Sequence, residues 1–225
     1  MQAKSGRLLL LDILTGVLLV AATVLVFFFT PIEAVMGPVQ KVFYFHVSMG
    51  WVGMLGFGVA AVVGIFYLRT GNRHWDLVAV AAVEIGMVFM LGTIISGAIW
   101  ARPIWNTWWT WDPRLTTAAI MELIYAAYLM LRQGVEDPER RARFGAVYAI
   151  VGFISVPLTF LSIRIFRSIH PVVIGNSAPM APLMLRAFIF SLVTFTVFFV
   201  DLLWHRVMLE QQEDAVQQLK QNLNQ

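Results

Sequence analysis

Residues 8–29, LLLLDILTGVLLVAATVLVFFF, decide the fold, because Asp12 is the only charged side chain among them. A helix needs about 20 mostly apolar residues to cross the roughly 30 Å hydrocarbon core of a bilayer. Lys4 and Arg7 precede the run as they would in a signal peptide. The run is longer than a signal-peptide core, however, and no small-x-small cleavage site closes it. We therefore predict a retained membrane-spanning helix.

The rest of the chain repeats this pattern. The 225 residues are 59% hydrophobic and 13% charged, with a mean hydropathy of +0.76. A soluble domain carries about a quarter charged residues. Apolar runs of spanning length lie at roughly 8–29, 47–68, 77–99, 115–131, 144–163 and 183–204. We expect an all-α integral membrane protein with six transmembrane helices in one domain, residues 1–225, without a separate soluble domain.

Lysine and arginine are unequally divided between the two sets of predicted loops. One side would hold Lys4, Arg7, Arg69, Arg73, Arg132, Arg140, Arg141, Arg143, Arg206 and Lys220. The other would hold Lys41, Arg102, Arg114, Arg164, Arg167 and, at its edge, Arg186. The more basic side of a membrane protein normally faces the cytoplasm. This asymmetry predicts two cytoplasmic termini and outward-facing loops at 30–46, 100–114 and 164–182.

The outward loop 100–114 is rich in tryptophan. Its sequence, WARPIWNTWWTWDPR, holds five of them: Trp100, Trp105, Trp108, Trp109 and Trp111. One or two would indicate an interfacial aromatic belt, but five in twelve residues favour an apolar shelf for a large planar molecule. The i, i+3, i+4 spacing of Trp105, Trp108 and Trp109 would place them on one face of a short helix. Asp112 before Pro113 is a typical helix N-cap, which predicts the start of the fourth span.

Two of the four histidines match the depth of this shelf. His46 and His170 fall at the outward ends of spans, whereas His74 and His205 fall at the inward ends and are expected to be solvated. The chain has no cysteine, so thiolate ligands and disulfides are excluded. Imidazole is a common axial ligand of haem iron, and arginine suits carboxylates such as the haem propionates. A flat apolar shelf, two histidines and nearby arginines together favour a haem site.

Other residues in the spans have predicted structural roles. Gly50, Gly53, Gly56 and Gly58, with Gly92 and Ser96 in the next span, would let two helices approach closely, and Pro157 should kink the fifth span. Ionisable groups within spans are functional candidates by default. For Glu84 and Asp201 we expect a role in the fold or in contacts with a partner helix. Glu122 would reach the haem edge or serve the fold, and Arg186 would meet a propionate.

The segment WARPIWNTWWTWDPRLT, residues 100–116, resembles the WWD signature of the haem-handling membrane proteins of cytochrome c maturation. Six spans, the segment FYFHVSMGW (43–51) and a single histidine between spans five and six are most similar to the CcmC type. Larger WWD relatives have more spans and more histidines. The resemblance covers nearly the whole chain. It implies that His46 and His170 are axial ligands and that Trp105, Trp108, Trp109, Trp111 and Asp112 form the haem shelf.

The resemblance also implies a place in the cell and a set of partners. Haem b would be bound transiently, as a substrate, at the periplasmic face of a bacterial inner membrane. It would be loaded onto a periplasmic haem chaperone, in a complex with the ATPase and permease of an ABC transporter and a small single-span subunit. Arg102 and Arg114, which bracket the tryptophans, are expected to bind the propionates. Membrane lipid surrounds the spans, no nucleic-acid partner is expected, and the task is haem transfer rather than classical enzyme catalysis.

Two other functions remain open from the residues alone. A solute transporter would have polar residues spread through its spans, whereas here they gather at the outward rim. A purely structural subunit of a membrane transporter complex would not need the paired histidines. A haem absorption band would distinguish haem handling from both.

Overall fold

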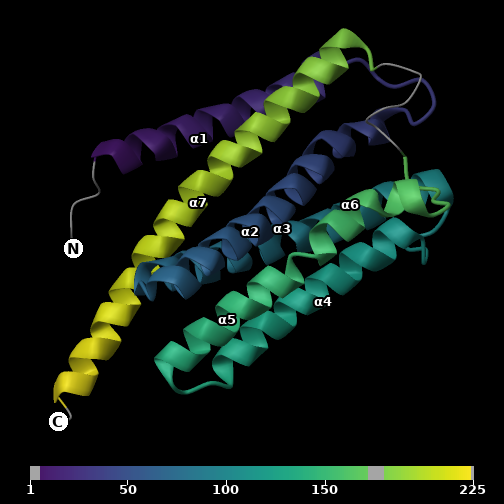
Figure 1. Ribbon diagram of the computed structural model, residues 1–225. Helices are drawn as coiled ribbons and strands as arrows, with labels where there is room; N and C mark the ends of the chain where they lie inside the picture. Colours follow the sequence, from purple (N-terminus) through teal and green to yellow (C-terminus); the bar gives the residue numbers. More distant parts are fainter. Residues whose placement is uncertain (1–5, 172–179, 224–225) are drawn as a thin grey trace.

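The structure is a computed structural model that describes residues 6–171 and 180–223. It is a bundle of antiparallel helices with no strand among the described residues (Figure 1). The helices are α1 (Gly6–Val24), η1 (Leu25–Phe29), η2 (Pro38–Lys41), α2 (Val42–Thr70), α3 (Arg73–Trp105), α4 (Pro113–Gln133), α5 (Pro138–Gly152), α6 (Ser155–Ile165) and α7 (Pro182–Leu223). The predicted all-α class is confirmed.

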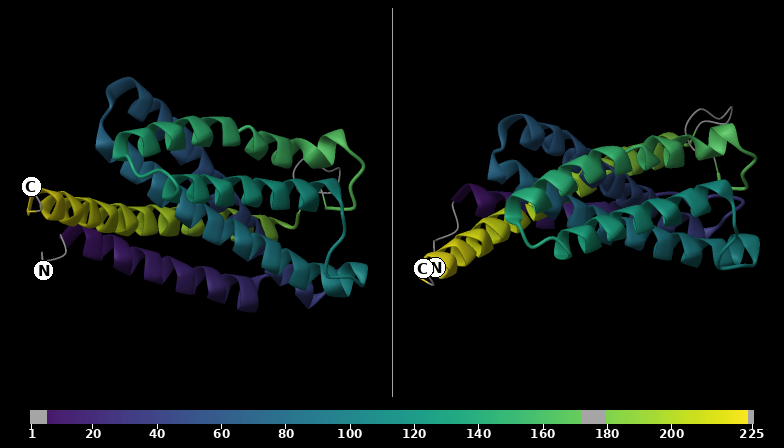
Figure 2. Two further views of the ribbon diagram at one scale, coloured as in Figure 1. Left: turned by 90° about the horizontal axis from the view of Figure 1, so that it is seen from below. Right: turned by 60° about the horizontal axis from the view of Figure 1, so that its bottom comes forward.

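Six stretches of the described chain are long and apolar enough to cross a membrane. They are Gly6–Phe29, Pro38–Thr70, Arg73–Trp105, Pro113–Gln133, Pro138–Ile165 and Pro182–Val216. Each contains one of the six apolar runs predicted from the sequence, so the number and order of the spans are confirmed. An even number of spans returns the chain to the side of the bundle where it began. The N-terminal end of α1 and the C-terminal end of α7 accordingly lie on the same side (Figures 1 and 2).

The bundle therefore has two ends with different connections. We call the end with the α2–α3 and α4–α5 turns the terminus end, and the end with segments 30–37, 106–112 and 166–171 the tryptophan end (Figure 2). The helices at the terminus end have clear local signals. Asn72 and Asp137 cap α3 and α5 by accepting from the backbone N–H groups of His74 and Arg140. Gly71, with φ of 65°, ends α2 in the left-handed region that glycine adopts readily.

The centre of the bundle is the close pairing of α2 with α3. A Cβ built on Gly56 would lie 2.6 Å from the carbonyl oxygen of Ala82, and one on Gly53 would lie 3.1 Å from that of Gly86. The two backbones are therefore too close for a side chain at Gly56, as the glycine pattern predicted. Next to this contact, the rings of Phe57 and Tyr125 stack with centroids 3.6 Å apart and join α4 to the core.

The fifth span is interrupted, as Pro157 predicted. α5 ends at Gly152 and α6 begins at Ser155. Proline has no N–H, so Pro157 cannot donate to the carbonyl of Phe153, four residues earlier. That carbonyl instead accepts from the N–H of Val156, 3.0 Å away, in a tighter turn. The chain thus crosses the membrane as two helical halves joined at Phe153 and Ile154.

Acids within the spans hold helices together. Glu84 of α3 pairs with Arg206 of α7, with Oε2 2.6 Å from Nε. On the other side of α7, His205 Nε2 lies 2.7 Å from Asp12 of α1 and 3.6 Å from Asp201. These contacts support the predicted fold roles of Glu84 and Asp201.

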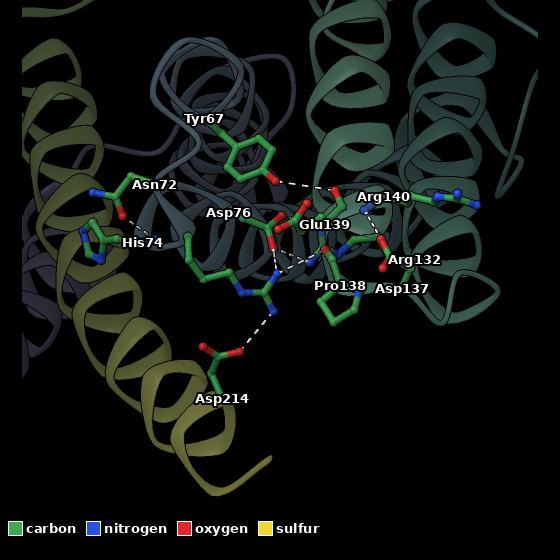
Figure 3. A network of polar contacts seen from close by, with 11 residues as sticks. Tyr67, Asn72, His74, Asp76, Arg132, Asp137, Pro138, Glu139, Arg140 and Asp214 are labelled. Carbon is green, nitrogen blue, oxygen red and sulfur yellow. Dashed lines mark hydrogen bonds and ion pairs between the residues drawn. The ribbon is translucent and has the colours of Figure 1, made fainter. Parts of the chain in front are cut away.

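A polar network joins four helices at the terminus end (Figure 3). Asp76 of α3 is 2% exposed and accepts from Nη1 and Nη2 of Arg132 at 2.6 and 3.0 Å. Arg73 lies 2.9 Å from the same carboxylate and 3.1 Å from Asp214 of α7. It also donates to the carbonyl of Pro138 at the start of α5. The guanidinium groups of Arg132 and Arg73 therefore compensate the buried charge of Asp76. The sequence alone did not predict this role for Asp76.

Candidate functional site

The tryptophan loop is shorter than predicted and is not helical. α3 continues through Arg102 and Pro103 to Trp105, so the loop proper is 106–112 rather than 100–114. Asn106 ends the helix in the left-handed region, with φ of 54°. Arg102 donates to the backbone carbonyl and the side-chain oxygen of Asn106 at 2.6 and 2.7 Å, which stabilises this ending. The predicted short helix across Trp105, Trp108 and Trp109 is therefore wrong.

Four of the five tryptophans instead form two edge-to-face pairs. The ring centroids of Trp100 and Trp105 are 5.1 Å apart at the end of α3, and those of Trp109 and Trp111 are 5.9 Å apart in the loop. Trp108 is 58% exposed and Trp111 is 81% exposed. Exposed indoles in one short segment form an apolar surface of the kind that marks a binding site or a membrane contact.

Asp112 ties this loop to the segment that carries His170. The carboxylate is buried, and its Oδ1 accepts from the backbone N–H of Arg114, which caps α4 as predicted. Oδ1 also accepts from the Ser168 hydroxyl at 2.9 Å, and Oδ2 accepts from the backbone N–H of Ile169 at 2.8 Å. One side chain therefore fixes the start of α4 and the backbone immediately before His170.

His170 lies against the end of α3. Its ring centroid is 6.5 Å from that of Trp105, in an edge-on arrangement. Its Nδ1 is 3.2 Å from the carbonyl oxygen of Pro171. Burial lowers the pKa of His170 below its ordinary value of 6.5, and the nearby Arg114 guanidinium lowers it further. His170 is therefore neutral at pH 7, the state in which imidazole can bind a metal.

His46 lies in the first turns of α2 and packs on the same helix. Its Nδ1 is 3.1 Å from Oγ of Ser96. The ring covers Gly97 so closely that a Cβ there would lie 2.9 Å from its Cε1. His46 at Gly97 and His170 at Trp105 therefore contact α3 about 12 Å apart along its axis, at 1.5 Å per residue. The structure brings the two histidines and the tryptophans to one end of one helix.

The arginines near the tryptophans differ in whether their guanidinium groups already have hydrogen-bond partners within the protein. Arg114 Nη1 donates to the carbonyl of Thr159 at 2.6 Å, and its Cζ lies 5.8 Å from the Phe160 ring centroid. Arg114 thus packs on α6. Arg102 is exposed but engaged with Asn106. The exposed Arg167 lines a shallow hollow with Trp111, Ser168 and Ile169, and so offers a cation beside the aromatic surface.

The remaining candidates lie elsewhere or lack a described partner. His74 and His205 are at the terminus end, where His74 contacts Gln211 and His205 contacts Asp12. Arg186 is exposed near the start of α7. Glu122 of α4 has a buried Oε2 without a hydrogen-bond partner among the described residues. Ser96 was predicted only as a small residue at a close helix contact, and Ser168 was not predicted at all, yet their hydroxyl oxygens contact Nδ1 of His46 and the backbone N–H of His170.

Comparison with known proteins assigns this arrangement to a family. The family described as "CcmC: Heme exporter protein C" matches residues 2–222. The chain belongs to this family. A heme exporter protein C of Rhodobacter capsulatus is 32% identical over 222 residues, which are 96% of this chain and 92% of that protein. One of Bradyrhizobium diazoefficiens is 32% identical over 169 residues, covering 72% of this chain and 64% of the relative.

The CcmC family extends beyond these bacterial proteins. A relative in Marchantia polymorpha, named "Putative cytochrome c biosynthesis ccmC-like mitochondrial protein", is 28% identical over 140 residues. That alignment covers 62% of this chain and 59% of the relative. The resemblance inferred from the WWD segment is thus confirmed at the level of the family.

Proposed function

We propose that this CcmC-family protein binds haem at its tryptophan end, between His46 and His170, and delivers it for the maturation of c-type cytochromes. The observation that carries the proposal is the convergence of both histidines on the end of α3 that bears Trp100 and Trp105. The names of the relatives, which describe heme exporters, support haem as the substrate.

The residues present fit the chemistry of haem. His170 is neutral at pH 7 because its pKa is lowered, so its imidazole can donate a lone pair to iron. Exposed indoles at Trp108 and Trp111 offer apolar area to a porphyrin ring. Arg167 and Arg102 lie at the same end and provide cations for propionates. Arg114 serves the site indirectly by fixing α4 on α6.

The exposure of the site suits a substrate that is handed on. A permanently held haem is normally enclosed between helices, whereas Trp108 and Trp111 are more than half exposed. We propose that this end faces the periplasm and presents haem b to a periplasmic haem chaperone. In this proposal the chain works with the ATPase and permease of an ABC transporter and a small single-span subunit. The location is the bacterial inner membrane, with both termini in the cytoplasm.

Absorption spectroscopy of histidine variants tests the proposal. The complex is purified in detergent from a haem-sufficient host and its Soret band is recorded before and after haem addition. His46→Ala and His170→Ala should each lower bound haem at least tenfold, while His74→Ala, at the terminus end, should retain it. Wild-type protein that neither carries nor takes up haem would refute haem binding. Equal losses in His74→Ala and His46→Ala at matched protein amounts would refute the proposed position.

A further inference from the structure

We propose that Ser96 is a positioning residue that holds His46 in the Nδ1–H tautomer and so directs its Nε2 lone pair to the haem iron. The effect on haem binding rests on the proposed function. The tautomer itself follows from the hydrogen bonds of the described residues, whether or not haem is bound. Ser96 does not contact the substrate in this scheme and acts only through the histidine.

The argument begins with the single proton of the Ser96 hydroxyl. Oγ lies 2.7 Å from the carbonyl oxygen of Gly92, one turn earlier on α3, and 3.1 Å from that of Thr93. Serines within helices commonly donate to a carbonyl one turn back in this way. A hydroxyl has one hydrogen to donate and two lone pairs to accept with. Since a carbonyl can only accept, the hydrogen of Ser96 is already used within α3.

The contact with His46 must therefore run in the opposite direction. Nδ1 of His46 is 3.1 Å from Ser96 Oγ. Because the Ser96 hydroxyl already donates its hydrogen to a carbonyl of α3, its oxygen can only accept a hydrogen bond from Nδ1. His46 thus carries its proton on Nδ1. In a neutral imidazole the other nitrogen, Nε2, is then unprotonated and free to bind a metal.

His170 reaches the same state by a different route. Its Nδ1 is 3.2 Å from the carbonyl oxygen of Pro171, which can only accept, so Nδ1 again carries the proton. Both histidines consequently present Nε2. One acceptor is a backbone carbonyl that substitution cannot remove, and the other is a side chain. The tautomer of His46 can therefore be altered by substituting Ser96, without replacing either histidine.

Such partners of a ligating histidine orient the ring and set its basicity, and their loss typically lowers metal affinity or activity about 10- to 100-fold. We expect Ser96→Ala to weaken haem binding within this range and to move the spectrum from six-coordinate towards five-coordinate haem. Ser96→Thr retains the hydroxyl and should restore most of the affinity. The matched control is Thr70→Ala, because Thr70 likewise donates to the carbonyl of Phe66 one turn back, at the end of α2 that belongs to the terminus end.

Nitrogen NMR of histidine-labelled, haem-free protein tests the tautomer directly. The His46 signals are assigned by their absence in His46→Gln. We expect a protonated Nδ1 and an unprotonated Nε2 in wild type and in Ser96→Thr, with a mixture of tautomers in Ser96→Ala. A protonated Nε2 in wild type would overturn the inference, as would haem affinity and spectrum unchanged in Ser96→Ala. If His46 has the expected tautomer but the protein binds no haem, the proposed function fails and the tautomer assignment stands.

Discussion

Asp76 at the terminus end and Asp112 at the tryptophan end are both buried, and the two ends use these carboxylates differently. At the terminus end, Asp76 is neutralised by Arg132 and Arg73, which link α3 to α4, α5 and α7 (Figure 3). At the tryptophan end, Asp112 accepts from two backbone N–H groups and one hydroxyl and leaves the indoles around it exposed. Ion pairs around Asp76 join the helices of the terminus end. Hydrogen bonds to Asp112 hold the loop at the tryptophan end in place and leave its apolar surface exposed.

The comparison predicts that the largest effect on stability comes from Asp76→Ala. The substitution leaves Arg132, whose side chain is 11% exposed, without its carboxylate partner. Removing one member of a buried ion pair costs about 3–5 kcal/mol. We expect a loss of this size in the free energy of unfolding in detergent, measured by denaturant titration.

Asp214→Ala is the control for this prediction, because its pair with Arg73 is more exposed. Exposed ion pairs contribute about 0–1 kcal/mol. A loss below about 1 kcal/mol for Asp76→Ala would contradict the view that the terminus end is held by this carboxylate.

Asp112→Ala should separate binding from stability at the tryptophan end. Loss of the N-cap costs about 0.5–2 kcal/mol, so the protein should remain folded. The segment before His170 loses two hydrogen bonds, and we expect bound haem to fall at least tenfold. The measurement is haem affinity by Soret titration beside unfolding in denaturant.

Asp112→Asn serves as the partial variant, since it keeps an acceptor oxygen for the α4 cap. We expect intermediate haem affinity and near-normal stability. Unchanged affinity in Asp112→Ala would show that His170 is positioned without this carboxylate.

Substitutions at Trp108 sharpen the difference between a haem shelf and a membrane anchor. Trp108→Phe should keep most of the haem transfer and Trp108→Ala should lose most of it, because phenylalanine retains much of the apolar area. Transfer is measured per molecule of membrane-inserted protein. If Trp108→Ala lowers only the amount of inserted protein and leaves the normalised rate unchanged, the indole is an interfacial anchor.

The smallest expected effect is a shift in pH dependence. The pKa of His170 is lowered by burial and by Arg114, and protonation removes the lone pair needed for iron. Haem binding should therefore be constant at neutral pH and fall only below pH 6.5, where an ordinary histidine would already be half protonated. Arg114→Gln removes the second cause and should move the midpoint towards 6.5. Soret titration against pH measures both, and a midpoint above 6.5 in wild type would contradict the assignment.

Much of the fold could be predicted from local sequence. The six apolar runs, the Asp-Pro start of α4, the glycines of α2 and the kink at Pro157 all depend on short-range rules of length, capping and sterics. The bonds from Asp112 to Ser168 and Ile169, and from His46 to Ser96, could not be predicted in the same way. They join residues about 50 apart in sequence and depend on how each helix is rotated about its axis.

The errors at the site have a similar origin. The spacing of Trp105, Trp108 and Trp109 suits a helix, but Asn106 adopts a left-handed conformation that the spacing does not encode. The sequence does not distinguish Asp76 from a solvated residue at the start of a helix, because Asp76 directly follows the turn RTGNRHW. Its burial arises from Arg132 on another helix.

The interruption between α5 and α6 has a mechanical consequence. A continuous helix would transmit any displacement of its far end to the rigid network at the terminus end, because bending it would break backbone hydrogen bonds. At Phe153 the helical bond to residue 157 is missing and is replaced by the tighter bond from Val156, so fewer regular helical hydrogen bonds resist bending there than in a continuous helix. α6, which holds Arg114 through Thr159 and leads to His170, is therefore expected to bend relative to α5 more easily than the two halves of an unbroken helix would. α5 is joined at its start to Arg73, which donates to the carbonyl of Pro138.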